Sequence, residues 1–169
     1  MKDQIVLIQC SSRADGDSGI VCSEISRMHN NTGHIDINAL DISAFDYQNK
    51  HESDDFLPTI KELNLKYDTW IFVTPVYWYS MSGQMKIFLD RITDLLKWHK
   101  DEGRKIRGKS MGLISVSNDP ELQEHFEIPV KLSAGYLGMR YIGHCHTWVE
   151  EGILSAEVKE RLNVFLKSI

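Results

Sequence analysis

The strongest constraint on the fold is a short, unbroken run of apolar and β-branched residues from Trp70 to Thr74, which ends at Pro75. Such a run is typical of a strand that is covered on both faces of a parallel sheet. Pro75 has no N–H to continue a strand ladder and biases the preceding residue toward an extended backbone, so we expect the strand to end there. The aromatic residues Tyr77, Trp78 and Tyr79 follow at once.

A helix is expected directly after this aromatic loop. Ser80 or Ser82 offers an N-cap, and the apolar residues that follow recur at helical spacing. These apolar residues are Met85, Phe88, Leu89, Ile92, Leu95 and Leu96. A strand, an aromatic loop and a helix N-terminus in this order are the layout of a ligand site at the carboxyl end of a parallel sheet.

Strand and helix patterns alternate along the whole chain. Ile5–Cys10 and Met111–Val116 are further continuous apolar runs, which we assign to central strands. His34–Ala39 alternates polar and apolar residues and Met139–Val149 is of mixed polarity, so both are predicted to be edge strands. Helices are expected from a cap at Asp17 or Ser18 to about residue 30, around residues 55–65, from a cap at Ser80 or Ser82 to about residue 97, and over 155–167. The segment 120–137 is expected to be helical in those parts that Pro129 and Gly135 do not interrupt, and 41–54 is expected to be a long loop.

These elements predict an α/β fold with a single, doubly wound, five-stranded parallel sheet of strand order 2-1-3-4-5. The switch point of this order lies between strands one and three, so the loops after those strands should flank a ligand. They are residues 11–18 and 75–82. We expect one domain over residues 1–169, because a chain of this length can bury about 70% of its unfolded surface.

The charge and the cysteine content limit the partners, metal sites and cellular location that we expect. The formal net charge of −5 argues against a nucleic-acid-binding surface, and the basic cluster at residues 104–109 is predicted to be a solvated connector. Cys10, Cys22 and Cys145 fit no disulfide or metal pattern, so we expect no bound metal and a location in the reducing cytoplasm. The N-terminal residues do not have the pattern of a signal peptide, and no apolar segment approaches the roughly 20 residues that span a membrane.

The two loops carry residue types that suit a phosphorylated aromatic cofactor. Ser11, Ser12 and Arg13 stand near a helix N-terminus, where hydroxyls, a guanidinium and the helix dipole can bind a phosphate, although an ordinary polar turn explains them equally well. The aromatic loop can stack on a planar ring, and a surface or dimer-interface cluster is the alternative. A phosphate loop and a stacking loop at one switch point together favour the cofactor.

The same two segments resemble a known family. VLIQCSSRADGDSG is similar to the GSSRxxGN[ST] opening of the NADPH-dependent FMN reductases, which are flavodoxin-like proteins. TPVYWYSMSGQMKIFLDR resembles their P-x-Y-x-x-x-x-x-x-Q-[ML]-K-x-F-[IL]-D-R segment. Milder similarity at residues 41–43 and 136–139 extends the resemblance over most of the chain. It implies a flavodoxin-like fold with FMN as cofactor and NADPH or NADH as co-substrate.

Carried over by position, the resemblance implies contacts to both ends of FMN. The implied phosphate contacts are Ser11, Ser12, Arg13 and Ser18. The implied contacts to the isoalloxazine ring are Pro75, Val76, Tyr77 and Trp78, with Ser117 and Asn118 at its other edge.

Five residues differ from the family pattern or suggest another kind of site. Asp17 stands where the family has Asn, and we expect it to cap backbone N–H groups while Arg13 neutralises the anion. Gln9 and Cys10 replace the small residues usual before the serines. His144 and His146 share one face of an edge strand, where we expect solvated side chains rather than metal ligands.

The implied function is an FMN-dependent NAD(P)H oxidoreductase that passes hydride from a nicotinamide to bound flavin and on to a quinone, a flavin or a similar small acceptor. The chemistry belongs mainly to the cofactor, so no catalytic side chain is named. A homodimer or homotetramer is expected, because a second subunit would shelter the aromatic loop and a half-exposed ring. The alternatives are a flavodoxin-like electron carrier that oxidises no nicotinamide and a flavin-free interaction scaffold.

Overall fold

The chain folds around one parallel sheet with the predicted strand order. The computed structural model describes residues 4–169. Its sheet has the order β2-β1-β3-β4-β5, and every neighbouring pair is parallel. The strands are β1 (Ile5–Gln9), β2 (Thr32–Asp36), β3 (Thr69–Pro75), β4 (Ser110–Ser117) and β5 (Arg140–Trp148). The predicted doubly wound, flavodoxin-like fold is confirmed.

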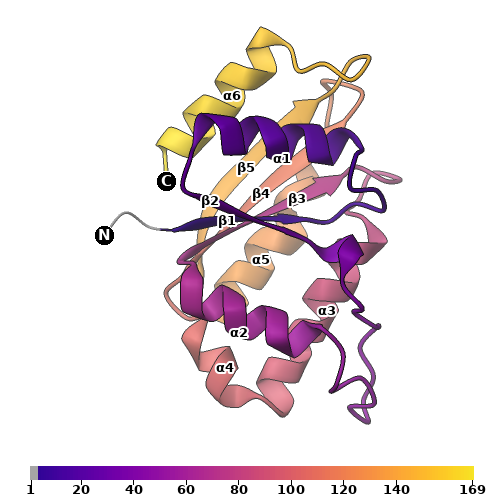
Figure 1. The fold of residues 1–169 in the computed structure, drawn as a ribbon, viewed down its shortest axis with the longest axis vertical. Coiled ribbons are helices and arrows are strands. Elements are labelled where there is room, and N and C mark those ends of the chain that lie inside the picture. The colour runs from indigo at the N-terminus through magenta and orange to yellow at the C-terminus, as the bar shows by residue number, and fades with distance from the viewer. Residues whose placement is uncertain (1–3) are drawn as a thin grey trace.

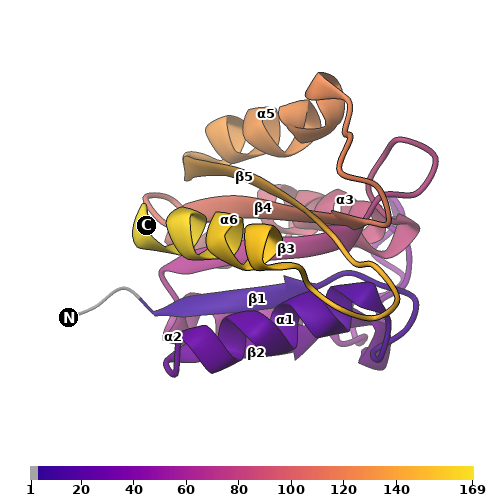
Figure 2. The same ribbon diagram turned by 90° about the horizontal axis from the view of Figure 1, so that it is seen from above.

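Helices cover both faces of the sheet (Figure 1, Figure 2). One face carries α1 (Asp17–Met28) and α6 (Ala156–Lys167), and the other carries α2 (Phe56–Lys66), α3 (Gly83–Lys97) and α5 (Ile128–Leu137). The short helix α4 (Lys100–Lys105) packs against α2 and α3, and 3-10 helices lie at Ile37–Ala39 and Glu124–Glu127. Within residues 4–169, none of the helices has the length and apolar character needed to cross a lipid bilayer.

Burial along the strands follows the hydrophobic pattern of the sequence. Residues 69–74 of β3 and 110–116 of β4 are all buried, whereas most residues of the edge strands β2 and β5 are partly exposed. Successive residues of the central strands enter different cores, so that Trp70 packs with α2 and α3 while Ile71 packs with α1 and α6. A strand with two covered faces needs a continuous apolar run, which explains why the sequence distinguishes central from edge strands.

The region before β5 differs from the sequence prediction. The sequence places interruptions at Pro129 and Gly135, but α5 runs through both. Pro129 lies in the first turn, where its missing N–H has no helical partner to lose, and a single internal glycine only weakens a helix. The helix ends at Gly138, whose φ of 71° forms a left-handed cap. The prediction also missed α4, whose last two residues, Arg104 and Lys105, belong to the basic cluster at residues 104–109.

The long loop over residues 41–54 is attached to α3 by a buried arginine. The side chain of Arg91 is only 3% exposed and forms ion pairs with Asp54 and Asp94. Its guanidinium also donates to the carbonyl oxygen of Ser43 at 3.0 Å and lies 4.8 Å from the centre of the Phe56 ring. Both buried carboxylates bond to the same guanidinium, so neither is left without an opposite charge, and the cluster ties the loop to α3.

Candidate cofactor site

The loops after β1, β3 and β4 meet at the carboxyl edge of the sheet, on the side to which the strand arrows point in Figure 2. The first two loops touch, since the hydroxyl groups of Ser12 and Tyr77 lie 3.3 Å apart. The second and third are joined where the N–H of Val76 donates to the carbonyl oxygen of Val116 at 2.9 Å. The structure therefore brings together the two segments that the predicted strand order places at the switch point.

Ser82 joins these loops from within the core. Its hydroxyl donates to the carbonyl oxygen of Cys10 at 2.6 Å and accepts the N–H of Met85 at 3.1 Å. Its own N–H donates to the hydroxyl of Thr74 at 3.0 Å. Ser82 is fully buried, so it caps α3 and at the same time holds the end of β1 against the end of β3. The sequence pattern includes Ser82 only as a possible cap, because a bond to a residue 72 positions away leaves no local signal.

The N-terminus of α1 has free hydrogen-bond donors. Its N-cap residue is Gly16, and no side chain caps the helix, so the prediction that Asp17 caps backbone N–H groups is wrong. Among the residues that the structure describes, the N–H groups of Asp17 and Ser18 have no acceptor, and the buried hydroxyl of Ser18 has no partner. Glycine stands where a capping side chain would be needed, which leaves these donors available to an external anion.

The first loop folds closely over this helix end. A Cβ atom at Gly19 would collide with the carbonyl oxygen of Ala14, and one at Gly16 would lie 3.4 Å from the guanidinium of Arg13. Arg13 is exposed and Ser11 is buried, with the Ser11 hydroxyl 3.4 Å from the N–H of Arg13. Unpaired N–H groups, a buried hydroxyl without a partner and a nearby cation form a donor set that fits a phosphate.

The aromatic loop is a two-residue turn that presents its rings to solvent. The backbone groups of Tyr77 and Ser80 bond to each other in both directions, at 2.9 and 3.0 Å. Trp78 and Tyr79 occupy the two central positions with φ of 50° and 62°, and their exposed fractions are 94% and 67%. A positive φ is unfavourable for bulky residues, so the chain holds two aromatic side chains on a strained turn. Pro75 and Val76 are half-buried beneath it.

The third loop is held by a chain of hydrogen bonds from β5. The side chain of Ser117 bonds to both the N–H and the carbonyl oxygen of Asp119. That carbonyl oxygen also lies 2.9 Å from Nε2 of His146, and the hydroxyl of Ser115 joins Nδ1 of His146 to Nε2 of His144 at 2.8 and 2.7 Å. Asn118, at the tip of the loop, is exposed.

The expectation that His144 and His146 are solvated is therefore wrong. A carbonyl oxygen only accepts, so Nε2 of neutral His146 carries the proton, Ser115 donates to its Nδ1, and His144 donates to Ser115. Burial lowers the pKa of His144 to about 4 and also lowers that of His146. Within the described part of the chain, no three His, Cys, Asp or Glu side chains are grouped as a metal would require. The two histidines thus help to hold the loop after β4 in place through hydrogen bonds.

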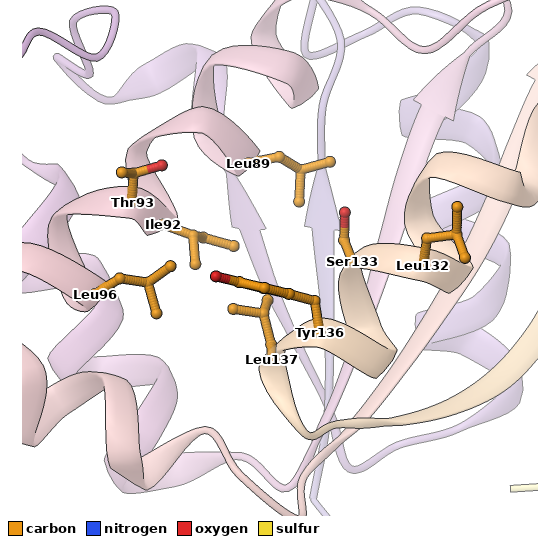
Figure 3. Close-up of a pocket in the computed structure, with 8 residues that line it drawn as sticks. All are labelled: Leu89, Ile92, Thr93, Leu96, Leu132, Ser133, Tyr136 and Leu137. Carbon is orange, nitrogen blue, oxygen red and sulfur yellow. The ribbon is translucent and has the colours of Figure 1, made fainter.

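Three cavities lie outside these loops. One of about 700 Å³ lies between β5 and α6, and one of about 320 Å³ lies between α3 and α5 (Figure 3). A smaller one of about 110 Å³ is lined by residues of η1 (Ile37–Ala39) and α3. Their linings include none of the residues predicted to contact FMN.

The fold and these loops define a doubly wound α/β protein in which a turn with free hydrogen-bond donors and an aromatic turn lie side by side at the switch point. A family model described as NADPH-dependent FMN reductase matches residues 4–152. The chain belongs to this family, and with it to the NAD(P)H-dependent flavin oxidoreductases.

Solved structures share the fold at low sequence identity. The Trp repressor binding protein from Bacillus subtilis has a TM-score of 0.75 at 18% identity, with 98% of this chain and 97% of that one covered. General stress protein 14 from Treponema denticola, in complex with FMN, has a TM-score of 0.67 at 15% identity, with 97% and 96% covered. A flavoenzyme NAD(P)H:acceptor oxidoreductase from Paracoccus denitrificans has a TM-score of 0.68 at 13% identity, with 98% and 96% covered. No curated protein matches the chain.

Proposed function

We propose that this chain binds FMN across the three loops and uses it to pass hydride from NADPH or NADH to a quinone, a flavin or a similar small acceptor. The observation that carries the proposal is the pairing of an uncapped helix end with an aromatic turn. The hydroxyl of Ser18 is buried without a partner, and Ser12 links the same loop to Tyr77. An anion site in contact with exposed rings suits a ligand that has a phosphate at one end and a flat ring at the other.

The phosphate is assigned to the first loop. Ser11, Ser12 and Ser18 supply hydroxyl groups, Arg13 supplies positive charge, and the first turn of α1 supplies free N–H groups. Asp17 is exposed at the first helical position and makes no cap, so its carboxylate stands beside the anion and weakens its binding.

The ring is assigned to the other two loops. It would lie against Pro75, Val76, Tyr77 and Trp78, with Ser117 and Asn118 at its other edge. FMN, when bound, supplies the hydride and electron chemistry. The protein orients the ring, leaves one side open to the nicotinamide, and presents loop N–H groups to the negative charge of the reduced ring.

Replacing Arg13 by Ala tests the phosphate assignment. We expect at least a tenfold weaker Kd for FMN, because a charge-assisted hydrogen bond to the phosphate is lost. Lys105→Ala is the matched control, since Lys105 lies on α4 and pairs with Glu102 at 2.7 Å. Equal losses in the two variants, measured by fluorescence titration, would reject this site.

The visible spectrum of the purified protein, before and after anaerobic NADPH, tests the activity. Bleaching of bound flavin by NADPH alone is the expected result. Bleaching that requires a partner reductase would instead identify an electron carrier. A colourless protein that takes up no FMN would identify a scaffold.

We further propose a homodimer, or a homotetramer built from it, through the apolar face of α3 and α5. Leu96, Leu132 and Tyr136 on this face are 42%, 67% and 80% exposed. Figure 3 shows Tyr136 extending from α5 across the cavity toward Ile92 and Leu96 of α3. None of the residues lining this cavity is charged, so a second copy can present the same face without like-charge repulsion.

We also propose a domain organisation and a cellular location. Residues 1–169 are proposed to form a single FMN-binding domain, in keeping with one sheet that collects every strand of the described residues. A cytoplasmic location is proposed because Cys10, Cys22 and Cys145 are free and buried, as suits a reducing compartment.

A further inference from the structure

Gln9, the last residue of β1, reaches from the sheet into the first loop. It is 1% exposed, which is unusual for a long polar side chain. Its Nε2 donates to the carbonyl oxygens of Arg13 and Ala14, at 3.3 and 3.1 Å. Its Oε1 lies 2.9 Å from Nε2 of His34 on β2. One side chain therefore connects the edge strand, the central strand and the anion-binding loop.

The hydrogen-bond partners of Gln9 determine which way its side-chain amide is oriented. Backbone carbonyl oxygens only accept hydrogen bonds, so the NH₂ end of Gln9 must face Arg13 and Ala14. Its oxygen then faces His34, whose Nε2 carries a proton. The reverse orientation would set the amide oxygen against two carbonyl oxygens. Gln9 can thus make all three bonds only in the observed arrangement.

The bonds from Gln9 determine where the loop N–H groups point. No peptide bond in the described residues is cis, and in a trans peptide the C=O and N–H point in opposite directions. With the carbonyl of Arg13 turned to Gln9, the N–H of Ala14 points away from it, and the carbonyl of Ala14 likewise turns the N–H of Asp15 away. Neither N–H donates to another group within residues 4–169. Two donors are therefore directed to the open side of the loop.

We propose that Gln9 is a positioning residue for the phosphate of FMN, because it holds two consecutive peptides with their N–H groups turned toward the anion. This inference rests on the proposed function. Gln9 itself touches no part of the cofactor. It acts by removing the freedom of the peptide groups at Arg13, Ala14 and Asp15 to rotate, so that binding an anion requires no reordering of the loop.

The test compares FMN with riboflavin, which has the same ring and no phosphate. In Gln9→Leu and Gln9→Glu, we expect the Kd for FMN to weaken at least tenfold and the Kd for riboflavin to change less than twofold. His34→Ala is the control, since water can replace an exposed imidazole at Oε1 of Gln9, and its expected effect on FMN is below threefold. Equal weakening for both ligands would show that Gln9 has only a structural role and would overturn the proposal.

A second measurement uses the unaltered protein, in case the Gln9 variants do not fold. The backbone amide NMR signals of Ala14 and Asp15 should shift on adding FMN and stay in place on adding riboflavin. Unmoved signals with saturating FMN would overturn the proposal. Failure of the Gln9 proposal alone would appear as FMN binding that Arg13→Ala weakens and Gln9→Leu does not. Failure of the proposed function would appear as no FMN binding by the unaltered chain.

Discussion

At the scale of single residues, the loop after β4 is held by partly or fully buried polar side chains, and its histidines must be neutral to make the observed hydrogen bonds. His144 donates to Ser115 through Nε2, and Ser115 in turn donates to His146, which holds the carbonyl of Asp119. Burial favours the neutral imidazole in the folded protein, because an imidazolium loses hydration there. The loop after β4 is therefore coupled to the titration of residues on β5.

This coupling predicts a loss of stability in mild acid. The pKa of His144 is about 4 in the folded protein and about 6.5 when unfolded, so the unfolded chain binds more protons between these values. Its contribution is complete above pH 6.5 and is lost as the pH falls toward 4. From pH 7 to pH 4.5, the free energy of unfolding should fall by about 2 kcal/mol more in the wild type than in His144→Gln, which keeps a donor to Ser115 and cannot titrate. Urea unfolding at both pH values measures this difference, and parallel losses would contradict it.

At the scale of elements, two connecting segments are held in place in different ways. The aromatic turn is closed by the two backbone bonds between Tyr77 and Ser80, and it carries strained backbone at Trp78 and Tyr79. The loop over residues 41–54 is held by a buried arginine with two acidic partners. The aromatic turn therefore exposes two rings on a strained backbone, whereas the loop over residues 41–54 is stabilised by buried ion pairs.

Replacing Tyr79 by Gly should stabilise the fold. Glycine adopts a φ near 62° without strain, and the ring that is lost is 67% exposed, so the free energy of unfolding should rise by about 0.5 to 1 kcal/mol. Tyr47→Gly is the matched control, because Tyr47 is 80% exposed and is not among the residues with positive φ. That change should destabilise. If both variants shift the urea midpoint in the same direction, the assigned strain is absent.

Arg91→Met should destabilise the protein strongly. The change leaves the carboxylates of Asp54 and Asp94 buried without their partner, which costs about 3 to 5 kcal/mol. Lys86→Met is the control on the same helix, since its pair with Asp90 is exposed and contributes less than about 1 kcal/mol. Thermal or urea unfolding of the two variants compares them directly. A loss below 1 kcal/mol for Arg91→Met would mean that the ion pairs do not hold the loop.

At the scale of the whole molecule, topology places the loops and leaves one apolar face uncovered. The order β2-β1-β3-β4-β5 makes β1 and β3 neighbours, so loops far apart in sequence share one edge. On one surface of the molecule, α3 and α5 expose leucines and a tyrosine around a cavity that is lined by no charged residue. The site loops and the proposed contact between copies therefore both involve α3, at its N-terminus and along its length.

Leu132→Glu should shift the protein from dimer to monomer. A carboxylate at a position that is 67% exposed in one copy would be buried without a partner in the symmetric contact. Val164→Glu, on α6 and 58% exposed, should leave the assembly unchanged. Size-exclusion chromatography with light scattering gives the mass of each variant. A monomeric wild type, or a dimer that survives Leu132→Glu, would reject this interface.

Particular residues show how far prediction from sequence reaches. The central strands, their order and the two switch-point loops were predictable, because burial on both faces leaves a continuous apolar run and parallel crossovers allow few arrangements. Gln9, Ser82 and the pair His144 and His146 were not. Each bonds to groups in other elements, and a polar residue carries no local mark of a distant partner.

The amino-acid sequence by itself determined which segments are buried strands, which loops follow the central ones, and which family the chain resembles, because these follow from side-chain hydrophobicity and short motifs. Only the tertiary structure decided that Gly16 leaves α1 uncapped, that Gln9 turns the peptides of the first loop, and that partly buried histidines hold the third. Hydrophobic burial is a property that each residue carries with it. A hydrogen-bond partner exists only once the packed elements bring two groups within about 3 Å of each other.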